Sequence, residues 1–285
     1  MSKTQSNIIV TDSDLANANG SIPVSMTNDF LFHILMQTNE HTLKSFICSL
    51  LHLDPAEVNS VTVINKISLK AEIDTKEYFL DVKVDLDGHT IINLELQVIN
   101  EGNWPERSLS YLSRTFDNLH SGEAYINVRS AIHIGILNFT LFEDSPEFFA
   151  THYLTNIKNH RIYSSKFRLS VLDLTQIDLA TDEDRAYHID QWAAFFKAKT
   201  WEELHMLAQN NPDIKEAVRT AYRLMQNDEV RWRCEAREDY IRREKDKQIL
   251  HERAIRERDQ ALAEAERLRN ILRKHGINAD EADDT

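Results

Sequence analysis

A stretch of alternating apolar and polar residues, FLDVKVDLDGHTIINLELQVI at positions 79–99, most constrains how this chain can fold. Asp87-Gly88 divides it into two halves, and Asp-Gly between alternating residues is typical of a β-hairpin turn. Side chains in a strand alternate with a period of two, so each half has one apolar face and one polar face. The polar residues are Asp81, Lys83 and Asp85 in the first half, and Asn93, Glu95 and Gln97 in the second.

The same alternation predicts the register of the hairpin, because directly paired residues point to the same side of a sheet. A two-residue loop would set Asp81 against Leu94 and mix the two faces. A three-residue loop sets Leu86 against Thr90, and such loops with Gly are common in hairpins. It also sets Asp81 against Glu95, with β-carbons about 5 Å apart. Two facing carboxylates repel each other, and a divalent cation between them would relieve the repulsion. The alternative is a half-exposed ribbon whose polar face is simply solvated.

Asp81, followed by Glu95-Leu96-Gln97 on the next strand, resembles the active site of the PD-(D/E)XK nuclease superfamily. Within it, the chain is most similar to the recombination-promoting nuclease (Rpn) / putative transposase family of bacteria. Leu80 stands where the motif's name has Pro, and Gln97 stands where other superfamily members carry the catalytic Lys. Gln is common at that position in the Rpn family.

The resemblance implies an α/β fold, a restriction-endonuclease-like mixed sheet flanked by helices with a helical C-terminal region that ends in a long charged helix. It also implies that Asp81, Glu95 and the backbone carbonyl of Leu96 bind Mg²⁺ or Mn²⁺. Gln97 would orient the attacking water or the phosphate. The implied activity is cleavage of DNA that promotes recombination.

Two further segments match the family. Asn28-Asp29-Phe30-Leu31-Phe32 resembles its opening D-x-x-F-K signature, with His33 where Lys is usual. Asp29 would then be a third acid near the metal; the alternative is an Asp at a helix start, favoured by the helix dipole. Residues 105–122 have apolar residues at helical spacing, with Pro105 in the first turn and Gly122 at the end. Arg107 and Tyr111 on this helix match the family's R-x-x-x-Y, which lies beside its active site. Arg107 would contact a phosphate; the alternative is a surface Arg packed along the helix.

The remaining segments predict an α/β core followed by helices. Residues 129–142 form a nearly continuous apolar run, which predicts a central strand buried on both faces. His133 lies inside that run, and we interpret it as a core residue. Residues 58–67, 152–156 and 166–174 predict further strands. From residue 183 onward the composition favours helices, including segments 200–209 and 213–226.

These patterns divide the chain into five predicted parts. They are a mobile N-terminal tail (1–21), the nuclease-like core (22–180), a helical subdomain packed on it (181–227), a long charged helix or weak coiled coil (228–276), and an acidic frayed end (277–285). The long helix lacks Gly and Pro as far as residue 274, and its acidic residues often precede basic ones at helical spacing. It is a candidate for homodimerisation, and DNA contact is a weaker alternative to an ordinary charged helix.

Composition limits the classes of function. A net charge of −13 argues against a constitutive nucleic-acid coat protein, but it leaves room for a nuclease whose metal screens the site. The two cysteines lack metal-type spacing, and the chain shows neither a membrane-length apolar run nor a signal pattern. We therefore expect a cytoplasmic protein with DNA as its partner and no membrane contact.

Two functions fit the sequence. The first is a magnesium-dependent DNA endonuclease. The second is a catalytically degenerate nuclease fold that serves as a protein- or DNA-binding platform, favoured by the missing Lys and the acidic body. The facing carboxylates favour the enzyme, because an unused pair of facing acids would destabilise the sheet.

Overall fold

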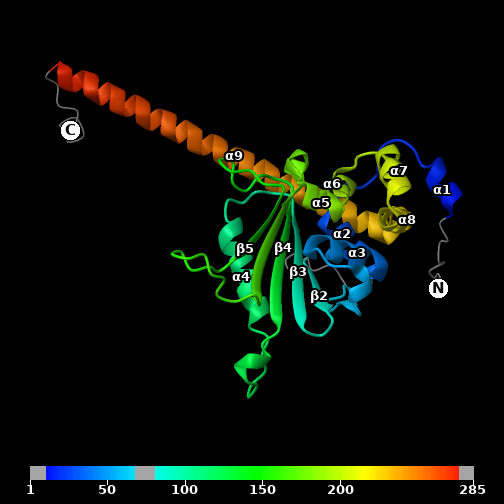
Figure 1. The fold of residues 1–285 in the computed structure, drawn as a ribbon. Coiled ribbons are helices and arrows are strands. Elements are labelled where there is room, and N and C mark those ends of the chain that lie inside the picture. Colours follow the sequence, from blue (N-terminus) through cyan, green and yellow to red (C-terminus); the bar gives the residue numbers. More distant parts are fainter. Residues whose placement is uncertain (1–10, 68–80, 276–285) are drawn as a thin grey trace. The chain divides into compact units, whose positions relative to one another are not determined.

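The computed structural model describes residues 11–67 and 81–275, and it contains a six-stranded mixed sheet with helices on both faces (Figure 1). The strand order is β1-β2-β3-β4-β6-β5. β3, β4 and β6 run parallel to one another, whereas β1 and β2 pair antiparallel with each other, β2 with β3, and β5 with β6. This sheet and its flanking helices confirm the predicted fold class.

Most elements agree with the sequence patterns, but the strand predicted at 152–156 lies at Phe149–Tyr153 instead. The strands are β1 (Val61–Val63), β2 (Val82–Leu86), β3 (Thr90–Gln97), β4 (Ser130–Leu137), β5 (Phe149–Tyr153) and β6 (Phe167–Asp173). The α-helices are α1 (Asp12–Asn17), α2 (Asp29–Thr38), α3 (Glu40–Leu51), α4 (Trp104–Phe116), α5 (Asp182–Ala186), α6 (Ile189–Lys197), α7 (Trp201–Asn210), α8 (Pro212–Met225) and α9 (Asp228–Lys274). Short 3-10 turns lie at η1 (Pro55–Glu57), η2 (Tyr125–Asn127) and η3 (Leu174–Leu179).

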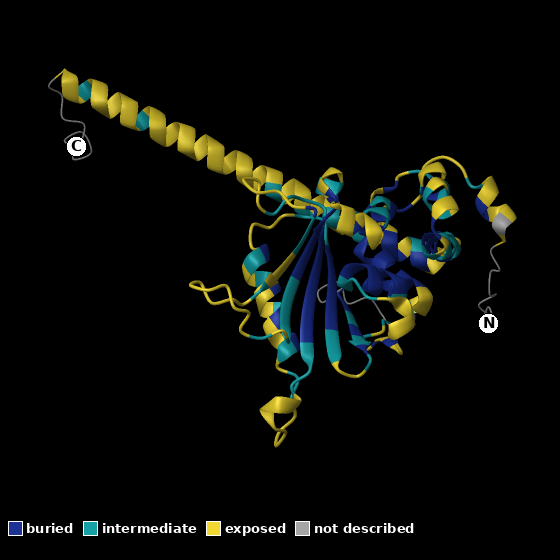
Figure 2. Ribbon diagram, viewed as in Figure 1, coloured by how far each residue is buried: buried dark blue, intermediate teal, exposed yellow. Residues whose placement is uncertain are grey.

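The sheet separates two hydrophobic clusters. The large cluster joins the apolar faces of β2, β3 and β4 to helices α2, α3, α6 and α8, with Phe46 and Trp192 at ring-centroid distance 5.1 Å. The small cluster lies on the other face under α4 and contains Trp104, Leu137 and Val171. Burial is therefore deepest in the central strands and in α2 (Figure 2). The small cluster closes the face on which the polar residues of β3 lie.

β4 occupies the centre of the sheet, as its apolar run predicted. It pairs in parallel with β3 on one side and β6 on the other. A parallel connection needs a crossover, and α4 supplies it between β3 and β4. The sequence predicted that this helix would end near Gly122, but it ends at Phe116. The chain leaves the helix early because the Asn118 side chain bonds both the backbone N–H and the carbonyl of Arg129, at the entry to β4.

The sequence predicted a mobile tail over residues 1–21, but the second half of this segment contacts the core. Residues 11–21 are ordered: Thr11 and Asp14 form a capping box at α1, and Leu15 is buried in the core. Gly20 accepts a hydrogen bond from the backbone of Trp201, and Ser21 forms a β-bridge with Thr200. The polar composition concealed these contacts because few apolar residues, Leu15 and the partly buried Ala18, anchor the segment. Residues 1–10 lie outside the described part of the chain.

The chain forms two compact units, residues 1–238 and 239–285. The first unit therefore extends into α9, past the predicted boundary at residue 228. Val230 and Cys234 are buried, and Arg237 forms an ion pair with Asp29. These contacts explain why the first turns of α9 belong to the core.

The second unit is the remainder of α9, and within the described helix no residue beyond Cys234 is buried (Figure 2). The predicted acidic end, residues 277–285, lies outside the described residues. Among residues 11–67 and 81–275, no helix has both the length and the apolar character needed to span a membrane.

Candidate active site

The polar face of β3 is buried, because α4 covers it. Asn93 is 0% exposed and Glu95 is 5% exposed, and Asp81 just before β2 is 8% exposed. The alternative of a solvated ribbon is therefore wrong. Burying carboxylates is unfavourable unless other groups compensate, so this face must hold partners for them.

The hairpin has the predicted register. Leu86 pairs with Thr90 and Val82 pairs with Leu94, which confirms the three-residue loop. The loop is possible because Asp87 and Gly88 both adopt positive φ, at 52° and 75°. Asp81 directly precedes Val82, so by continuation of this register it faces Glu95 on the polar side.

The parallel pairing of β3 with β4 adds a second row to this face. Asn93 lies beside His133, and Glu95 lies beside Gly135. Gly135 leaves room for an indole: a β-carbon at that position would lie 2.1 Å from Cζ2 of Trp104. Trp104, the first residue of α4, therefore packs directly on the sheet beside Glu95.

The two carboxylate oxygens of Glu95 have different surroundings. Its Oε1 lies 2.7 Å from Nη2 of Arg107, in an ion pair between β3 and α4. Its Oε2 is buried and has no hydrogen-bond partner among the described residues. Nε2 of His133 lies 3.7 Å from it, too far for a hydrogen bond. Burial raises the pKa of Glu95 to about 7, against the opposing effect of the Arg107 charge.

Asp81 shares this environment. Burial raises the pKa of its carboxyl above the ordinary value, and the charges of Lys83 and Arg107 oppose the rise. The negative charge of Asp81 contributes in turn to the raised pKa of Glu95. The two carboxyls are thus a coupled, desolvated pair in which both anions are disfavoured in the absence of a further cation.

His133 is a neutral residue at the base of the site. Its Nδ1 lies 3.0 Å from Nδ2 of Asn93, so the amide donates to the ring. Tyr111 stacks parallel to the ring, with centroids 6.0 Å apart, and Trp104 lies at 5.7 Å. Burial lowers the pKa of His133 to about 3, and the nearby charge of Arg107 acts in the same direction. His133 therefore packs against the site without adding charge to it.

Arg107 and Tyr111 lie where the family pattern predicted, beside the carboxylates. The guanidinium of Arg107 lies 5.7 Å from the Tyr111 ring centroid, and its Nη1 lies 3.4 Å from Glu101. The Arg107 side chain is 30% exposed. Arg107 is therefore more than a surface Arg packed along the helix, since it binds Glu95 and still reaches solvent, and its contact with a phosphate stays a prediction.

Gln97 lies at the end of β3 and is half-buried. Its Nε2 donates a hydrogen bond of 3.0 Å to the backbone carbonyl of Ile99, which fixes the amide. The structure does not bring Asp29 to the same place. Asp29 begins α2, on the face of the large cluster, and its carboxylate binds Arg237 at 2.6 Å and the Phe30 N–H at 2.9 Å. The helix-start role is therefore observed, and a role of Asp29 at a metal stays a prediction.

The residues present fit a hard divalent cation. Glu95 Oε2 is a buried acceptor without a donor, which is costly unless a cation or donor satisfies it. The Gln97 carbonyl accepts from Asn138 N on the β4 side, so the preceding carbonyl, of Leu96, points to the β2 side. Within residues 11–67 and 81–275, no group of three or more His, Cys, Asp or Glu side chains could hold a metal. Two carboxylates and a carbonyl, completed by water, suit Mg²⁺ or Mn²⁺.

Sequence reasoning missed three residues that shape the site: Asn93, His133 and Trp104. Asn93 shares the strand face of Glu95, which alternation alone indicates. His133 was interpreted as a core residue, and it is fully buried, but the register of β3 with β4 brings it to the carboxylates. The small residue at Gly135 was the available signal for Trp104.

Comparison with known families identifies the family to which the chain belongs. A family model described as PD-(D/E)XK nuclease family transposase matches residues 26–252, most of the chain and all of the site residues above. The chain therefore belongs to this family, which confirms the resemblance carried by Asp81 and Glu95-Leu96-Gln97. No curated protein and no solved structure matches the chain.

Proposed function

We propose that this chain, as a member of the PD-(D/E)XK nuclease family transposases, is a metal-dependent DNA endonuclease that hydrolyses phosphodiester bonds and thereby promotes recombination. One observation carries the proposal. Asp81 and Glu95 lie on one buried sheet face, and Glu95 Oε2 has no partner among the described residues. Two desolvated acids of this kind are unfavourable in a purely structural role and useful in a metal site.

Asp81, Glu95 and the Leu96 carbonyl would hold Mg²⁺ or Mn²⁺, which when bound polarises the scissile phosphate and lowers the pKa of a bound water. Arg107 holds Glu95 in place through Nη2 and reaches solvent with the rest of its partly exposed side chain. Its guanidinium is suited to a phosphate oxygen of the DNA backbone. The Tyr111 ring packs against the guanidinium of Arg107.

Gln97 places a neutral amide where other members of the superfamily carry the positive charge of a Lys. The amide can donate and accept at once, and its Nε2 already donates to Ile99. Its acceptor oxygen, which has no donor among the described residues, can therefore position a water, while the positive charge near the carboxylates comes from Arg107 rather than from β3.

The test is nicking of supercoiled plasmid DNA with Mg²⁺ or Mn²⁺ and with EDTA. We expect metal-dependent nicking by the wild type and none by Asp81→Asn or Glu95→Gln. Asp85→Asn is the matched control, because Asp85 lies on the same face of β2 but pairs with Arg129, away from Glu95. Activity that survives both substitutions at Asp81 and Glu95 would refute the site.

Metal binding is measured separately from cutting. At a pH above 7, Mg²⁺ or Mn²⁺ should raise the thermal midpoint of the wild type and of Asp85→Asn. It should raise the midpoints of Asp81→Asn and Glu95→Gln much less, since ligand binding stabilises only a chain that retains its ligands.

A degenerate, DNA- or protein-binding platform is the second candidate. Arg107 already neutralises Glu95 at 2.7 Å, as a site without a metal would require, and Gln97 supplies no charge. DNA binding without any metal-dependent nicking, and without stabilisation by either metal, would favour this function over the first.

The proposed setting is the cytoplasm. Cys48 and Cys234 are both buried and unpaired, which agrees with a reducing compartment. We further propose homodimerisation through α9, whose exposed Ile255 and Leu262 lie seven residues apart as in a coiled-coil seam. Sedimentation of the full chain beside a chain ending at Glu238 tests this: only the full chain should dimerise.

A further inference from the structure

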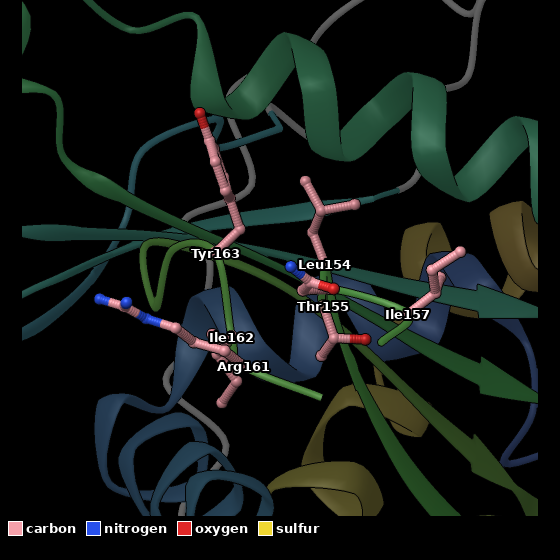
Figure 3. A pocket seen from close by; sticks show the side chains of 7 residues that line it. Leu154, Thr155, Ile157, Arg161, Ile162 and Tyr163 are labelled. Carbon is pink, nitrogen blue, oxygen red and sulfur yellow. The ribbon is translucent and has the colours of Figure 1, made fainter. Parts of the chain in front are cut away.

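A preformed hairpin, residues 154–163, projects from the sheet between β5 and β6. Leu154 bonds Tyr163 and Asn156 bonds Arg161 through the backbone, and Thr155 bridges Ile162. Its side chains line an open hollow of about 640 Å³, with Leu154 and Tyr163 on one side (Figure 3). Backbone hydrogen bonds therefore pair the two arms of the hairpin, and binding through it needs little further ordering.

The hairpin and its flanks are positively charged in an acidic chain. Residues 148–172 contain no Asp or Glu, although the whole chain has 46 among 285 residues. The segment carries Lys158, Arg161, Lys166 and Arg168, and none of these has a carboxylate partner among the described residues. By contrast, Arg107, Arg129 and most arginines of α9 are paired with acids.

Large apolar side chains are exposed on the same structure. Ile157 at the tip is 90% exposed and Tyr163 is 84% exposed. Lys166 at the foot of the hairpin donates to the backbone carbonyls of Ile126 and Val128, which ties η2 to it. Ile126 is itself 81% exposed. Apolar groups beside unpaired cations mark a binding surface rather than a solvated loop.

We propose that the hairpin of residues 154–163 is a second DNA-binding element, an arm that grips duplex DNA outside the catalytic site. Lys158 and Arg161 contact phosphates, and Ile157 enters a groove. The partner follows from charge: cations without acids on a chain of net charge −13 select a polyanion. A two-stranded ribbon has the right width for the major groove, where an apolar side chain can contact the methyl group of thymine. The inference rests on the proposed function, which makes DNA the substrate.

The test measures DNA affinity without cleavage. The full chain carrying Asp81→Asn, in EDTA, is titrated against a fluorescent duplex over a range of salt concentrations. Adding Lys158→Ala with Arg161→Ala should lower the slope of log affinity against log salt by about 2 and weaken binding about 30-fold near 0.15 M salt, since each phosphate contact contributes a slope of about 0.9. Adding Ile157→Ala should weaken binding with the slope unchanged, because an apolar contact releases no counterions.

The matched control is Lys197→Ala with Lys199→Ala, which removes the same charge from exposed sites at the end of α6 and just beyond it. It should change the affinity and the slope far less. Equal effects of the two double variants, or no effect of the hairpin variant, would overturn the proposal. So would loss of binding to vesicles of anionic phospholipid with DNA affinity retained, since that outcome assigns the arm to a membrane.

Nicking separates this inference from the proposed function. If the wild type cuts DNA and the hairpin variants bind and cut like it, the nuclease stands and the arm is wrong. If nothing is cut but the hairpin variants lose DNA affinity, the arm stands and the nuclease is wrong.

Discussion

The raised pKa of Glu95 makes a quantitative prediction about stability in the absence of metal. The carboxyl titrates near 7 in the folded chain and near its ordinary 4.5 in the unfolded one. Between these values the folded state holds a proton that the unfolded state has lost, so the free energy of unfolding falls as the pH rises. The favourable contribution is complete below 4.5 and is lost as the pH rises through 7. The difference corresponds to about 3 kcal/mol, and Glu95 is buried enough to need little discount for solvent screening.

Glu95→Gln removes this titration while keeping the shape of the side chain. We expect the stability of Glu95→Gln relative to the wild type to rise by about 2.5 kcal/mol between about pH 5 and about pH 8. Asp81 is present in both proteins, so its own titration enters both profiles and only its coupling to Glu95 differs between them. The assay is urea unfolding in EDTA followed by tryptophan fluorescence. All four tryptophans lie within residues 1–238, so the signal reports the core and not the outer part of α9.

Glu101→Gln is the control for this measurement. Glu101 also contacts Arg107, at 3.4 Å, but its side chain is 48% exposed. The loss of stability with rising pH that Glu95 causes should remain in this variant. A flat difference between Glu95→Gln and the wild type would refute the reasoning, because the buried Glu95 would then be no harder to ionise than a free carboxyl.

Three further outcomes follow from the structure. Gly135→Ala should destabilise the core by about 1–3 kcal/mol in urea unfolding, because its β-carbon would overlap the Trp104 ring; adding Trp104→Phe should recover part of the loss, and no recovery would contradict the contact. Gln97→Ala should slow single-turnover cleavage on the order of tenfold to a thousandfold and Gln97→Lys should be tolerated; wild-type speed for Gln97→Ala would reduce Gln97 to a surface residue. A chain ending at Glu238 should stay folded by circular dichroism, whereas one ending at Asn227 loses the buried start of α9 and should be less stable; equal stability would place the boundary earlier.

Local patterns in the sequence predicted the parts of the fold that are local. The hairpin register follows from alternation and from Asp87-Gly88, and both are contained in one short stretch. The apolar run of β4 predicted its central place for the same reason. The environment of His133 could not be predicted in this way, because it depends on a parallel register between strands that are far apart in sequence. The order of residues 11–21 likewise depends on distant contacts, those of Gly20 and Ser21 with α7 and its cap.

The candidate site shows the same division. Asp81 and Glu95 were predicted because their pairing is local. Their burial was not, since it comes from α4, which reaches the face only through the crossover to β4. The Glu95–Arg107 ion pair is a contact between two elements that the family pattern named separately. The helix α9 spans Asp228–Lys274, close to the predicted 228–276. How far the core extends into it was less predictable, because few of its residues are apolar and buried, such as Val230 and Cys234.

The position of the Arg107 guanidinium depends on how α4 packs on the sheet, and the catalytic proposal depends on that position. Gly135 leaves the space that Trp104 fills, and Trp104 anchors the first turn of α4. Arg107 lies three residues later, on the same face of the helix, and therefore meets Glu95 across the gap. A chain with Gln97 in place of Lys lacks a charge on β3, and this arrangement supplies one from the crossover helix instead. The positive charge beside Glu95 therefore depends on Gly135 as well as on Arg107.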